Sequence, residues 1–166
     1  MTRGRDWQGE NLAGWLLSEK LDGCRAYWDG STLWTRGGNE IPAPASFLAA
    51  LPAGQPLDGE IYAGRGHLET ARLAVQFGHW TPALRFVAFD SPATPGTWPA
   101  RLAAARRVYG DCVIATPCRS NDHARELIEA IQAAGGEGLV ARSPYVTGYE
   151  RGKTGNVLKI KSPPLA

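Results

Sequence analysis

Ser18-Glu19-Lys20-Leu21-Asp22-Gly23-Cys24-Arg25 places a lysine, an Asp-Gly turn and an arginine within six positions. A lysine acts as a nucleophile only after it has lost a proton, and cationic neighbours with partial desolvation favour that loss. Lys20 is therefore a candidate nucleophile. The alternative is a surface lysine beside a turn, and on this short motif alone the alternative is the better interpretation, because such patterns arise by chance.

The sequence around this motif predicts strands. Trp15 to Trp28, then Asp29-Gly30 and then Thr32 to Thr35 are typical of two strands joined by a tight hairpin, because Asp-Gly accepts the positive φ that such turns need. Lys20 is therefore expected between strands or at a strand end.

The rest of the chain alternates short apolar runs with helical patterns. The expected strands are Leu57–Tyr62, Leu84–Asp90, Gly138–Arg142 and Asn156–Lys161, and the expected helices are Leu68–Phe77, Pro99–Tyr109 and Asp122–Ala134. Because strands outnumber helices and the two occur in mixed order, we expect an α+β domain and not a doubly wound parallel sheet.

Composition narrows the class of protein without identifying a partner. A chain of 166 residues with 43% apolar residues and six tryptophans is expected to form one packed domain. Its formal charge of +2 is too small to establish a polyanionic partner. Because it has no run of about 18 apolar residues and no apolar segment near Met1, neither a membrane span nor a secretion signal is expected, and the expected location is cytoplasmic.

Four further segments carry chemically useful side chains in a fixed order along the chain. They offer, in turn, an acidic pair, an aromatic beside a carboxylate, a glutamate between glycines and two lysines on one strand face. The segments are Leu57-Asp58-Gly59-Glu60-Ile61-Tyr62, Phe86-Val87-Ala88-Phe89-Asp90, Gly136-Glu137-Gly138-Leu139-Val140 and Leu158-Lys159-Ile160-Lys161. Taken singly, each has an ordinary structural explanation: a hairpin end, a core aromatic pair, a solvated loop or a charged edge strand.

Together with the Lys20 segment, and in this order, they resemble motifs I, III, IIIa, IV and V of the covalent nucleotidyltransferases. This superfamily comprises the ATP-dependent DNA ligases, RNA ligases and mRNA capping enzymes. The resemblance implies the adenylation domain of an ATP-dependent DNA ligase, filling residues 1–166 with its motifs in residues 20–161. It also implies two antiparallel sheets with flanking helices and a nucleotide cleft between the sheets.

Site roles follow from the resemblance position by position. Lys20 matches the nucleophile that becomes linked to AMP, and Lys159 and Lys161 match the pair that contacts the α-phosphate. Phe89 matches the aromatic that stacks on the purine, as a flat apolar face can do. Further residues implied to contact the nucleotide are Glu19, Arg25, Glu60 and Glu137.

The same resemblance implies ATP and a divalent cation, Mg²⁺ or Mn²⁺, as cofactors. Glu137 matches the metal-site glutamate, and Glu60 is a second candidate ligand. Mg²⁺ prefers a few carboxylate oxygens together with phosphate and water, which suits such a site. Charge developing on a transferred phosphoryl group needs fixed cations, which suits Lys159 and Lys161.

A nucleic-acid partner is implied by Thr35-Arg36-Gly37-Gly38-Asn39, which resembles ligase motif Ia, whose arginine contacts the 5′-phosphate at a nick. The alternative is a loop arginine in a glycine-rich turn. With Trp28-Asp29-Gly30, Ala43-Pro44 and Gly64-Arg65-Gly66, the chain is similar to minimal bacterial ATP-dependent ligases of the Lig E type. Arg65 is then a candidate DNA contact, because ligases hold duplexes mainly through phosphates. The expected partner is nicked double-stranded DNA, bound by a monomer.

Two other functions stay open at this point. One is an RNA ligase or a capping-type nucleotidyltransferase, although the Arg36 segment favours DNA. The other is a non-catalytic nick-binding module, which the intact Lys20, Glu137 and Lys159 disfavour.

The sequence departs from the family pattern at its ends. Complete ligases of this kind continue past motif V into an OB-fold domain, whereas this sequence stops five residues after Lys161. We therefore expect the OB-fold domain to be absent, or supplied as a separate chain. Adenylation of the protein by ATP is then expected to be impaired. Ligases of this group also commonly carry an export signal, so a periplasmic location is the alternative if such a signal has been removed.

Overall fold

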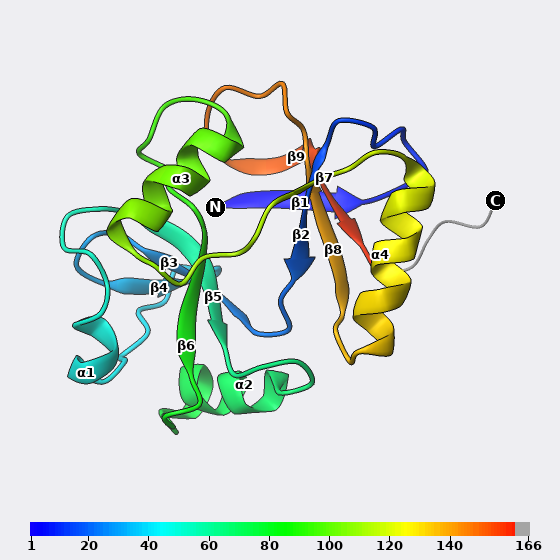
Figure 1. Cartoon of the computed structure of the whole chain (residues 1–166). Helices are drawn as coiled ribbons and strands as arrows, with labels where there is room; N and C mark the ends of the chain where they lie inside the picture. Colours follow the sequence, from blue (N-terminus) through cyan, green and yellow to red (C-terminus); the bar gives the residue numbers. More distant parts are fainter. Residues whose placement is uncertain (162–166) are drawn as a thin grey trace.

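The fold is built from two β-sheets, with helices packed against them (Figure 1). The computed structural model describes residues 1–161. The five-stranded sheet has the order β1-β9-β8-β2-β7 and the four-stranded sheet has the order β4-β3-β5-β6. The two-sheet α+β architecture expected from the sequence is confirmed.

The elements have the following bounds. The five-stranded sheet contains β1 (Thr2–Asp6), β2 (Leu16–Lys20), β7 (Thr116–Pro117), β8 (Gly138–Arg142) and β9 (Gly152–Ile160). The four-stranded sheet contains β3 (Cys24–Trp28), β4 (Leu33–Thr35), β5 (Leu57–Tyr62) and β6 (Arg85–Asp90). The helices are α1 (Ala45–Leu48), α2 (Leu68–Phe77), α3 (Trp98–Val108) and α4 (Asn121–Ala133).

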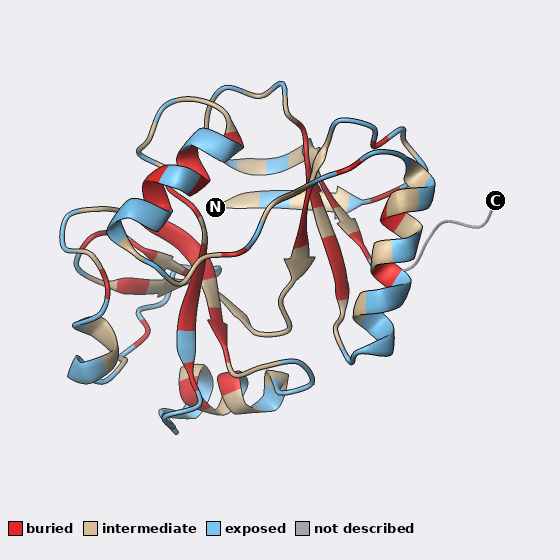
Figure 2. Cartoon of the chain, in the orientation of Figure 1, coloured by how far each residue is buried: buried red, intermediate tan, exposed pale blue. Residues whose placement is uncertain are grey.

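Each sheet has its own apolar core, and burial is concentrated along the strands and the inner faces of the helices (Figure 2). Leu17 of β2, Ala141 of β8 and Ile128 of α4 belong to the core of the five-stranded sheet. The four-stranded sheet packs against α2, where Ala71 and Ala74 are buried in the same core as Ile61. A third cluster, which includes Trp98 of α3, lies next to β6. The strands of both sheets are therefore held in place by apolar packing against the helices.

The prediction for the segment around Lys20 is partly wrong. The hairpin at Asp29-Gly30 is present and joins β3 to β4, with the backbone N–H of Asp29 donating to the carbonyl oxygen of Thr32 at 3.0 Å and Gly30 at a φ of 106°. However, Trp15 to Trp28 is not one strand. It breaks after Lys20, and β2 and β3 belong to different sheets.

The break depends on the glycine of the Asp-Gly turn. At this point the chain crosses from one sheet to the other and passes close to β5. A Cβ atom placed on Gly23 would overlap the carbonyl oxygen of Ile61. Only glycine fits this close backbone approach, so Lys20 lies at the end of a strand where the two sheets are joined.

A second correction concerns strand direction. The sheets were expected to be antiparallel, but β1 pairs parallel to β9, with Thr2 opposite Gly152. β1 has the sequence Thr-Arg-Gly-Arg-Asp, which lacks the alternating apolar residues that predict a strand, so the sequence did not indicate it. β9 likewise begins four residues before the expected Asn156, because its first part, Gly-Lys-Thr-Gly, is polar.

The three cysteines, Cys24, Cys112 and Cys118, are free thiols. Within residues 1–161, no helix is long and apolar enough to cross a membrane.

Candidate functional site

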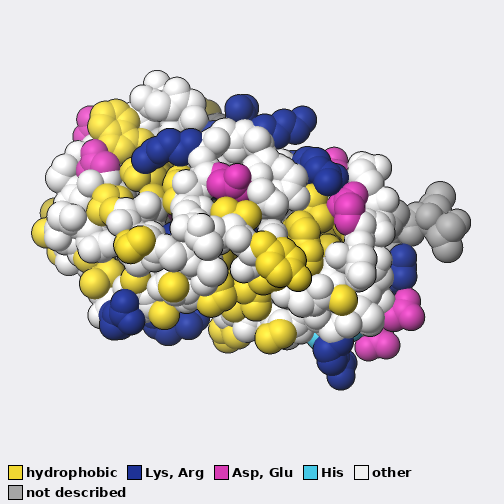
Figure 3. All heavy atoms as spheres, turned by 90° about the horizontal axis from the view of Figure 1, so that it is seen from above, with side chains coloured by type: hydrophobic (Ala, Val, Ile, Leu, Met, Phe, Trp, Pro, Cys, Tyr) yellow, Lys and Arg dark blue, Asp and Glu magenta, His cyan; other side chains and the backbone are white. Residues whose placement is uncertain are grey.

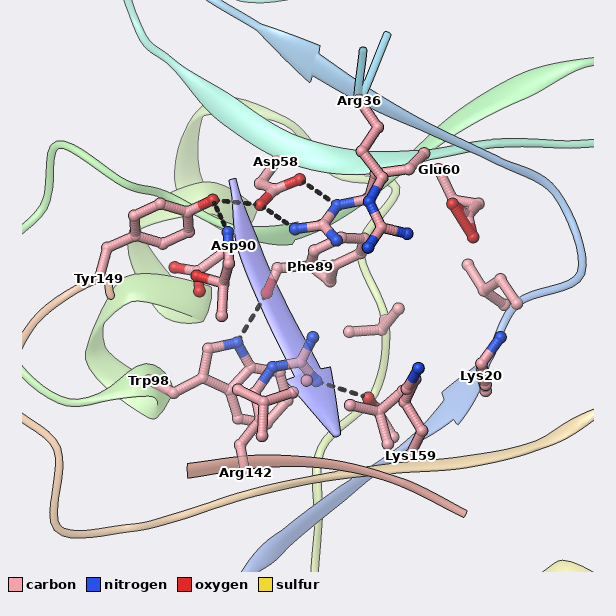
Figure 4. Close-up of a pocket in the computed structure, with 18 of the residues that line it drawn as sticks. Lys20, Arg36, Asp58, Glu60, Phe89, Asp90, Trp98, Arg142, Tyr149 and Lys159 are labelled. Atoms are coloured by element: carbon pink, nitrogen blue, oxygen red, sulfur yellow. Dashed lines mark hydrogen bonds and ion pairs between the residues drawn. The ribbon is translucent and has the colours of Figure 1, made fainter. Parts of the chain in front are cut away.

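A cavity of about 650 Å³ lies between the two sheets and receives side chains from both of them (Figure 4). This volume is in the range of pockets that bind small molecules or cofactors. Most of the residues implied by the motifs line it: Glu19, Lys20, Arg25, Arg36, Glu60, Phe89 and Lys159. Glu137 and Lys161 lie beside it: Glu137 forms an ion pair with Lys20, and Lys161 forms an ion pair with the same Glu137 carboxylate. The structure therefore brings residues from all five motifs to one cleft.

The pairing register of β2 and β8 sets the position of Lys20, the candidate nucleophile. Lys20 ends β2 and lies opposite Gly138, the first residue of β8, so Glu137 is next to it. The Lys20 Nζ atom is 2.9 Å from Glu137 Oε1, and the Lys161 Nζ atom is 3.2 Å from the same oxygen. Partial burial acts to raise the pKa of Glu137, but the hydrogen bonds and charges of Lys20 and Lys161 outweigh it and hold that pKa below its usual value.

The second lysine of the pair expected at the α-phosphate has a different partner. Lys159 lies on β9 opposite Asp6 of β1, and its Nζ atom is 3.7 Å from Asp6 Oδ1. This long contact between exposed groups is weak. Lys159 also lines the cleft, in the same part of Figure 4 as Lys20. Its amine is therefore available to a phosphate that enters the cleft.

The wall formed by the four-stranded sheet carries a buried ion pair. Arg25 of β3 donates to both carboxylate oxygens of Asp58 on β5, at 2.7 and 2.6 Å, and Asp58 is completely buried. Burial alone would lower the pKa of Arg25, but the hydrogen bonds and charge of Asp58 raise it. The Tyr149 hydroxyl also donates to Asp58, at 2.5 Å, and accepts a hydrogen bond from the backbone N–H of Thr2 at 2.9 Å. This network fixes the guanidinium of Arg25.

The Glu60 carboxyl has an unusually high pKa. It lies opposite Arg25 in the β3–β5 register and lines the cleft. Burial raises the pKa of Glu60 to about 7, although the positive charges of Arg25 and Lys20 act in the opposite direction. The group is therefore close to half-protonated at neutral pH, and additional positive charge in the cleft would favour its carboxylate form.

The residues present fit a magnesium ion bound together with phosphate. No group of three or more His, Cys, Asp and Glu residues gathers in the described part of the chain. A protein site for Mg²⁺ with a phosphorylated ligand commonly uses only one or two carboxylates, the other ligands being phosphate oxygens and water. Glu137 and Glu60 can supply such carboxylates, and their metal-binding role stays a prediction.

The aromatic residue expected to stack on the purine is in place. Phe89 of β6 lines the cleft, and the Arg25 guanidinium carbon lies 4.9 Å from its ring centroid. The indole N–H of Trp98 donates to the backbone carbonyl of Phe89 at 2.7 Å. The position of the ring is therefore held through its backbone, and its role towards a purine stays a prediction.

The two predicted DNA contacts lie at the edge of the cleft but differ in their surroundings. Arg36 is exposed in the turn after β4 and points into the cleft in Figure 4. Arg65 lies in the loop after β5 and donates to both carboxylate oxygens of Glu19 on β2, at 2.8 and 3.0 Å. This pair links the two sheets beside Lys20. On the face shown in Figure 3, Lys and Arg side chains are scattered and do not form one basic surface.

Sequence reasoning assigned no role to several residues that line the cleft, among them Asp58, Tyr149 and Arg142. Asp58 lies within a quoted motif segment but had no role assigned to it. Tyr149 and Arg142 also line the cleft, and Arg142 is buried with 8% of its surface exposed. Tyr149 has no recognisable local pattern. Arg142 is the last residue of the strand expected at Gly138–Arg142, and a charged residue at the end of an apolar strand was the one signal that could have revealed it.

Comparison with known proteins identifies the family of this chain. No family model matches the sequence. A curated DNA ligase of Haemophilus influenzae is 31% identical over 165 residues, which is 94% of this chain and 61% of that ligase. A solved structure of a Lig E DNA ligase is also 31% identical, with a TM-score of 0.86, and the match covers 98% of this chain and 68% of that one.

A more distant structure agrees with these in fold. The chlorella virus DNA ligase-adenylate is 19% identical with a TM-score of 0.78, and the match covers 96% of this chain and 66% of the viral protein. The expected fold is thus seen in solved ligases, and the identity and coverage of the Lig E match go beyond a shared fold. This chain belongs to the DNA ligase family, as an adenylation domain that resembles the minimal Lig E ligases.

Proposed function

We propose that this chain is the nucleotide-transferring part of an ATP-dependent DNA ligase, with Lys20 as the residue that becomes linked to AMP. The observation that supports this most directly is the placement of Lys20. Lys20 lines the cleft, and its amine lies 2.9 Å from the carboxylate of Glu137, with the amine of Lys161 3.2 Å from the same oxygen. A nucleophile and an array of fixed cations are what transfer of a phosphoryl-type group requires.

The positions of the lysines also support this proposal. The sequence contains four lysines: Lys20, Lys153, Lys159 and Lys161. Lys20 and Lys159 line the cleft and Lys161 shares the Glu137 carboxylate with Lys20, whereas Lys153 is exposed on β9 and does not line the cleft. Chance placement of surface lysines does not favour such convergence, so the pattern supports a site for phosphate groups.

In the first step the Lys20 amine attacks the α-phosphorus of ATP, a P–N bond forms, and pyrophosphate leaves with the electrons of the broken P–O bond. The amine must first lose a proton, which its ion pair with Glu137 opposes. A divalent cation at Glu137 would neutralise this carboxylate and add positive charge beside Lys20, which favours the uncharged amine. In this proposal Lys159 and Lys161 stabilise the negative charge on the α-phosphate.

In the second step the 5′-phosphate of a nick attacks the same phosphorus, which releases Lys20 and leaves AMP joined to the DNA. In the third step the adjacent 3′-hydroxyl attacks the DNA phosphate, AMP leaves, and the strand is sealed. Because the first two steps share one phosphorus centre, one set of cations serves both. Arg36 and Arg65 are the proposed contacts for the DNA phosphates.

Labelling tests this function directly. The protein is incubated with ATP carrying a labelled α-phosphate and Mg²⁺, and the label is located on a peptide. We expect labelling at Lys20 that Lys20→Ala abolishes, whereas the matched control Lys153→Ala keeps it. GTP in place of ATP and nicked RNA in place of DNA test the capping-type and RNA-ligase alternatives. Equal labelling of Lys20→Ala and wild type would show that another residue is the nucleophile.

A further inference from the structure

One buried charge in the cleft has no role in the proposed reaction. Arg142 ends β8, and 8% of its surface is exposed. Its Nη1 atom donates to the Ser18 hydroxyl on β2 at 3.0 Å. Within residues 1–161, no carboxylate lies within ion-pair distance of its guanidinium, in contrast to Arg101, which pairs with Asp90 at 2.8 Å. A buried guanidinium with one neutral hydrogen-bond partner is costly, so its presence needs a reason.

The charge is retained despite its surroundings. Burial lowers the pKa of Arg142 to about 10, and the charges of Asp90 and Asp58 offset only part of this effect. A group with this pKa is still protonated at neutral pH. The contacts of Arg142 must therefore suit a planar cation.

Those contacts are aromatic and come from the opposite side of the cleft. The guanidinium carbon of Arg142 lies 4.3 Å from the ring centroid of Trp98 and 5.3 Å from that of Phe89. Figure 4 shows Arg142 beside Trp98, whose indole N–H donates to the Phe89 carbonyl. Both distances are within the range of cation–π contacts, which strengthen when the cation is desolvated. Arg142 therefore connects the five-stranded sheet to β6 and α3.

The position of Arg142 along its strand separates it from the phosphate chemistry. In the β2–β8 pair, Lys20 lies opposite Gly138, whereas Arg142 lies opposite Leu16, at the other end. The nucleophile and Arg142 thus occupy opposite ends of the same two strands. Arg142 is placed to act on the part of a ligand that is far from the reacting phosphorus.

We propose that Arg142 is a positioning residue for nucleotide binding, which holds the Phe89 ring in the orientation that receives the purine. The proposal rests on the proposed function, in which Phe89 stacks on the base of ATP. A guanidinium is planar and stacks on aromatic faces, whereas a lysine ammonium carries the same charge without a flat surface. Arg142→Lys therefore removes the stacking and keeps the charge.

The experiment measures binding of ATP and of tripolyphosphate, which has no base, to wild type, Arg142→Lys, Phe89→Ala and the double variant. We expect Arg142→Lys to weaken ATP binding about tenfold, the scale of a desolvated cation–π contact, and to leave tripolyphosphate binding unchanged. In the Phe89→Ala background the same substitution should have no further effect on ATP, because the two residues act as one unit.

Three results would overturn the proposal: ATP affinity equal to wild type in Arg142→Lys, an equal loss for ATP and tripolyphosphate, or losses that multiply in the double variant. If Arg142→Lys fails to fold, Ser18→Ala provides the second test. It removes the hydrogen bond that orients Arg142 and should weaken ATP binding in the same direction by a smaller factor, with tripolyphosphate again unaffected. An unchanged ATP affinity there counts against the proposal.

Failure of the proposed function looks different. Because this experiment measures binding, it does not depend on Lys20 forming an adduct. A wild-type protein that binds ATP with the expected Arg142 dependence but is never labelled would contradict the proposed reaction alone. A wild-type protein that does not bind ATP would contradict both.

Discussion

Glu60 shows how one side chain can make stability depend on pH. Burial raises its pKa from 4.5 to about 7. Between these values the folded state binds more protons than the unfolded state, so the stability from this group is complete below pH 4.5 and falls as the pH rises towards 7. We expect Glu60→Gln to remove most of this fall and to stabilise the protein above pH 7 by on the order of 1–3 kcal/mol.

Thermal unfolding from pH 5 to pH 8 measures this effect. In Glu60→Gln a slope of the same sign remains from Asp90, whose pKa is also raised by burial. Glu69→Gln is the matched control, because Glu69 is exposed on α2 and its nearest ion-pair distance, to Arg72, is 3.9 Å. The explanation fails if Glu60→Gln and wild type lose stability with pH in parallel.

Among the elements, the connection between β2 and β3 depends most on a single residue. Gly23→Ala would place a methyl group against the carbonyl oxygen of Ile61, and backbone atoms move away less easily than side chains. We expect a loss of about 2–3 kcal/mol of unfolding free energy, the scale of an overpacked site. Gly110→Ala is the control, because a Cβ there meets open space. Denaturant unfolding should therefore separate the two variants, and equal stability would show that the crossing can relax.

The elements also show which features a sequence can predict. β5, β8 and α2 were predicted with their observed bounds, because each is an apolar pattern that ends at glycine, proline or charged residues. β1 and β7 were missed, since one is polar and the other has two residues and both depend on partners far along the chain. The continuous apolar character of Trp15 to Trp28 likewise gives no sign that the chain changes sheets.

In the candidate site, too, residues in local sequence motifs could be predicted, whereas residues that depend on distant partners could not. Lys20 ends β2, Glu137 directly precedes β8 and Glu60 lies within β5. Each belongs to a local motif, so the motif order was enough to predict their convergence. Tyr149 could not be found in this way, because its partner Asp58 is 91 positions away in the sequence. Contacts of this kind depend on the packing of the two sheets and leave no local pattern.

At the scale of the whole molecule, this chain spans only part of the length of its relatives. The match covers 61% of the Haemophilus influenzae ligase. Residues 1–161 contain the proposed nucleophile, the proposed phosphate-binding lysines and the aromatic residue proposed to stack on the purine. We therefore expect residues 1–166 alone to seal a nick that already carries 5′-AMP more efficiently than they seal an ordinary nick with ATP. Sealing of a pre-adenylated nick needs no expulsion of pyrophosphate.

Both substrates should be compared at several salt concentrations. Binding should be weak and should fall steeply with salt, because the proposed contacts of Arg36 and Arg65 are to phosphates. Lys20→Ala separates the steps, since it should abolish the ATP-dependent reaction and retain sealing of the pre-adenylated nick. Efficient ATP-dependent sealing by residues 1–166 would show that no further part of a ligase is needed.

Two of the four lysines line the cleft and a third, Lys161, lies beside it. The reactivity of these lysines can therefore report whether a ligand occupies the cleft. Acylating reagents such as succinimidyl esters modify primary amines and leave guanidinium groups intact, so the arginines contribute no signal. A ligand seated in the cleft should shield Lys20, Lys159 and Lys161 from acylation, while Lys153 reacts at an unchanged rate as an internal standard. Mass spectrometry of the digested protein would thus reveal occupancy of the cleft by any compound, without a label, a DNA substrate or turnover.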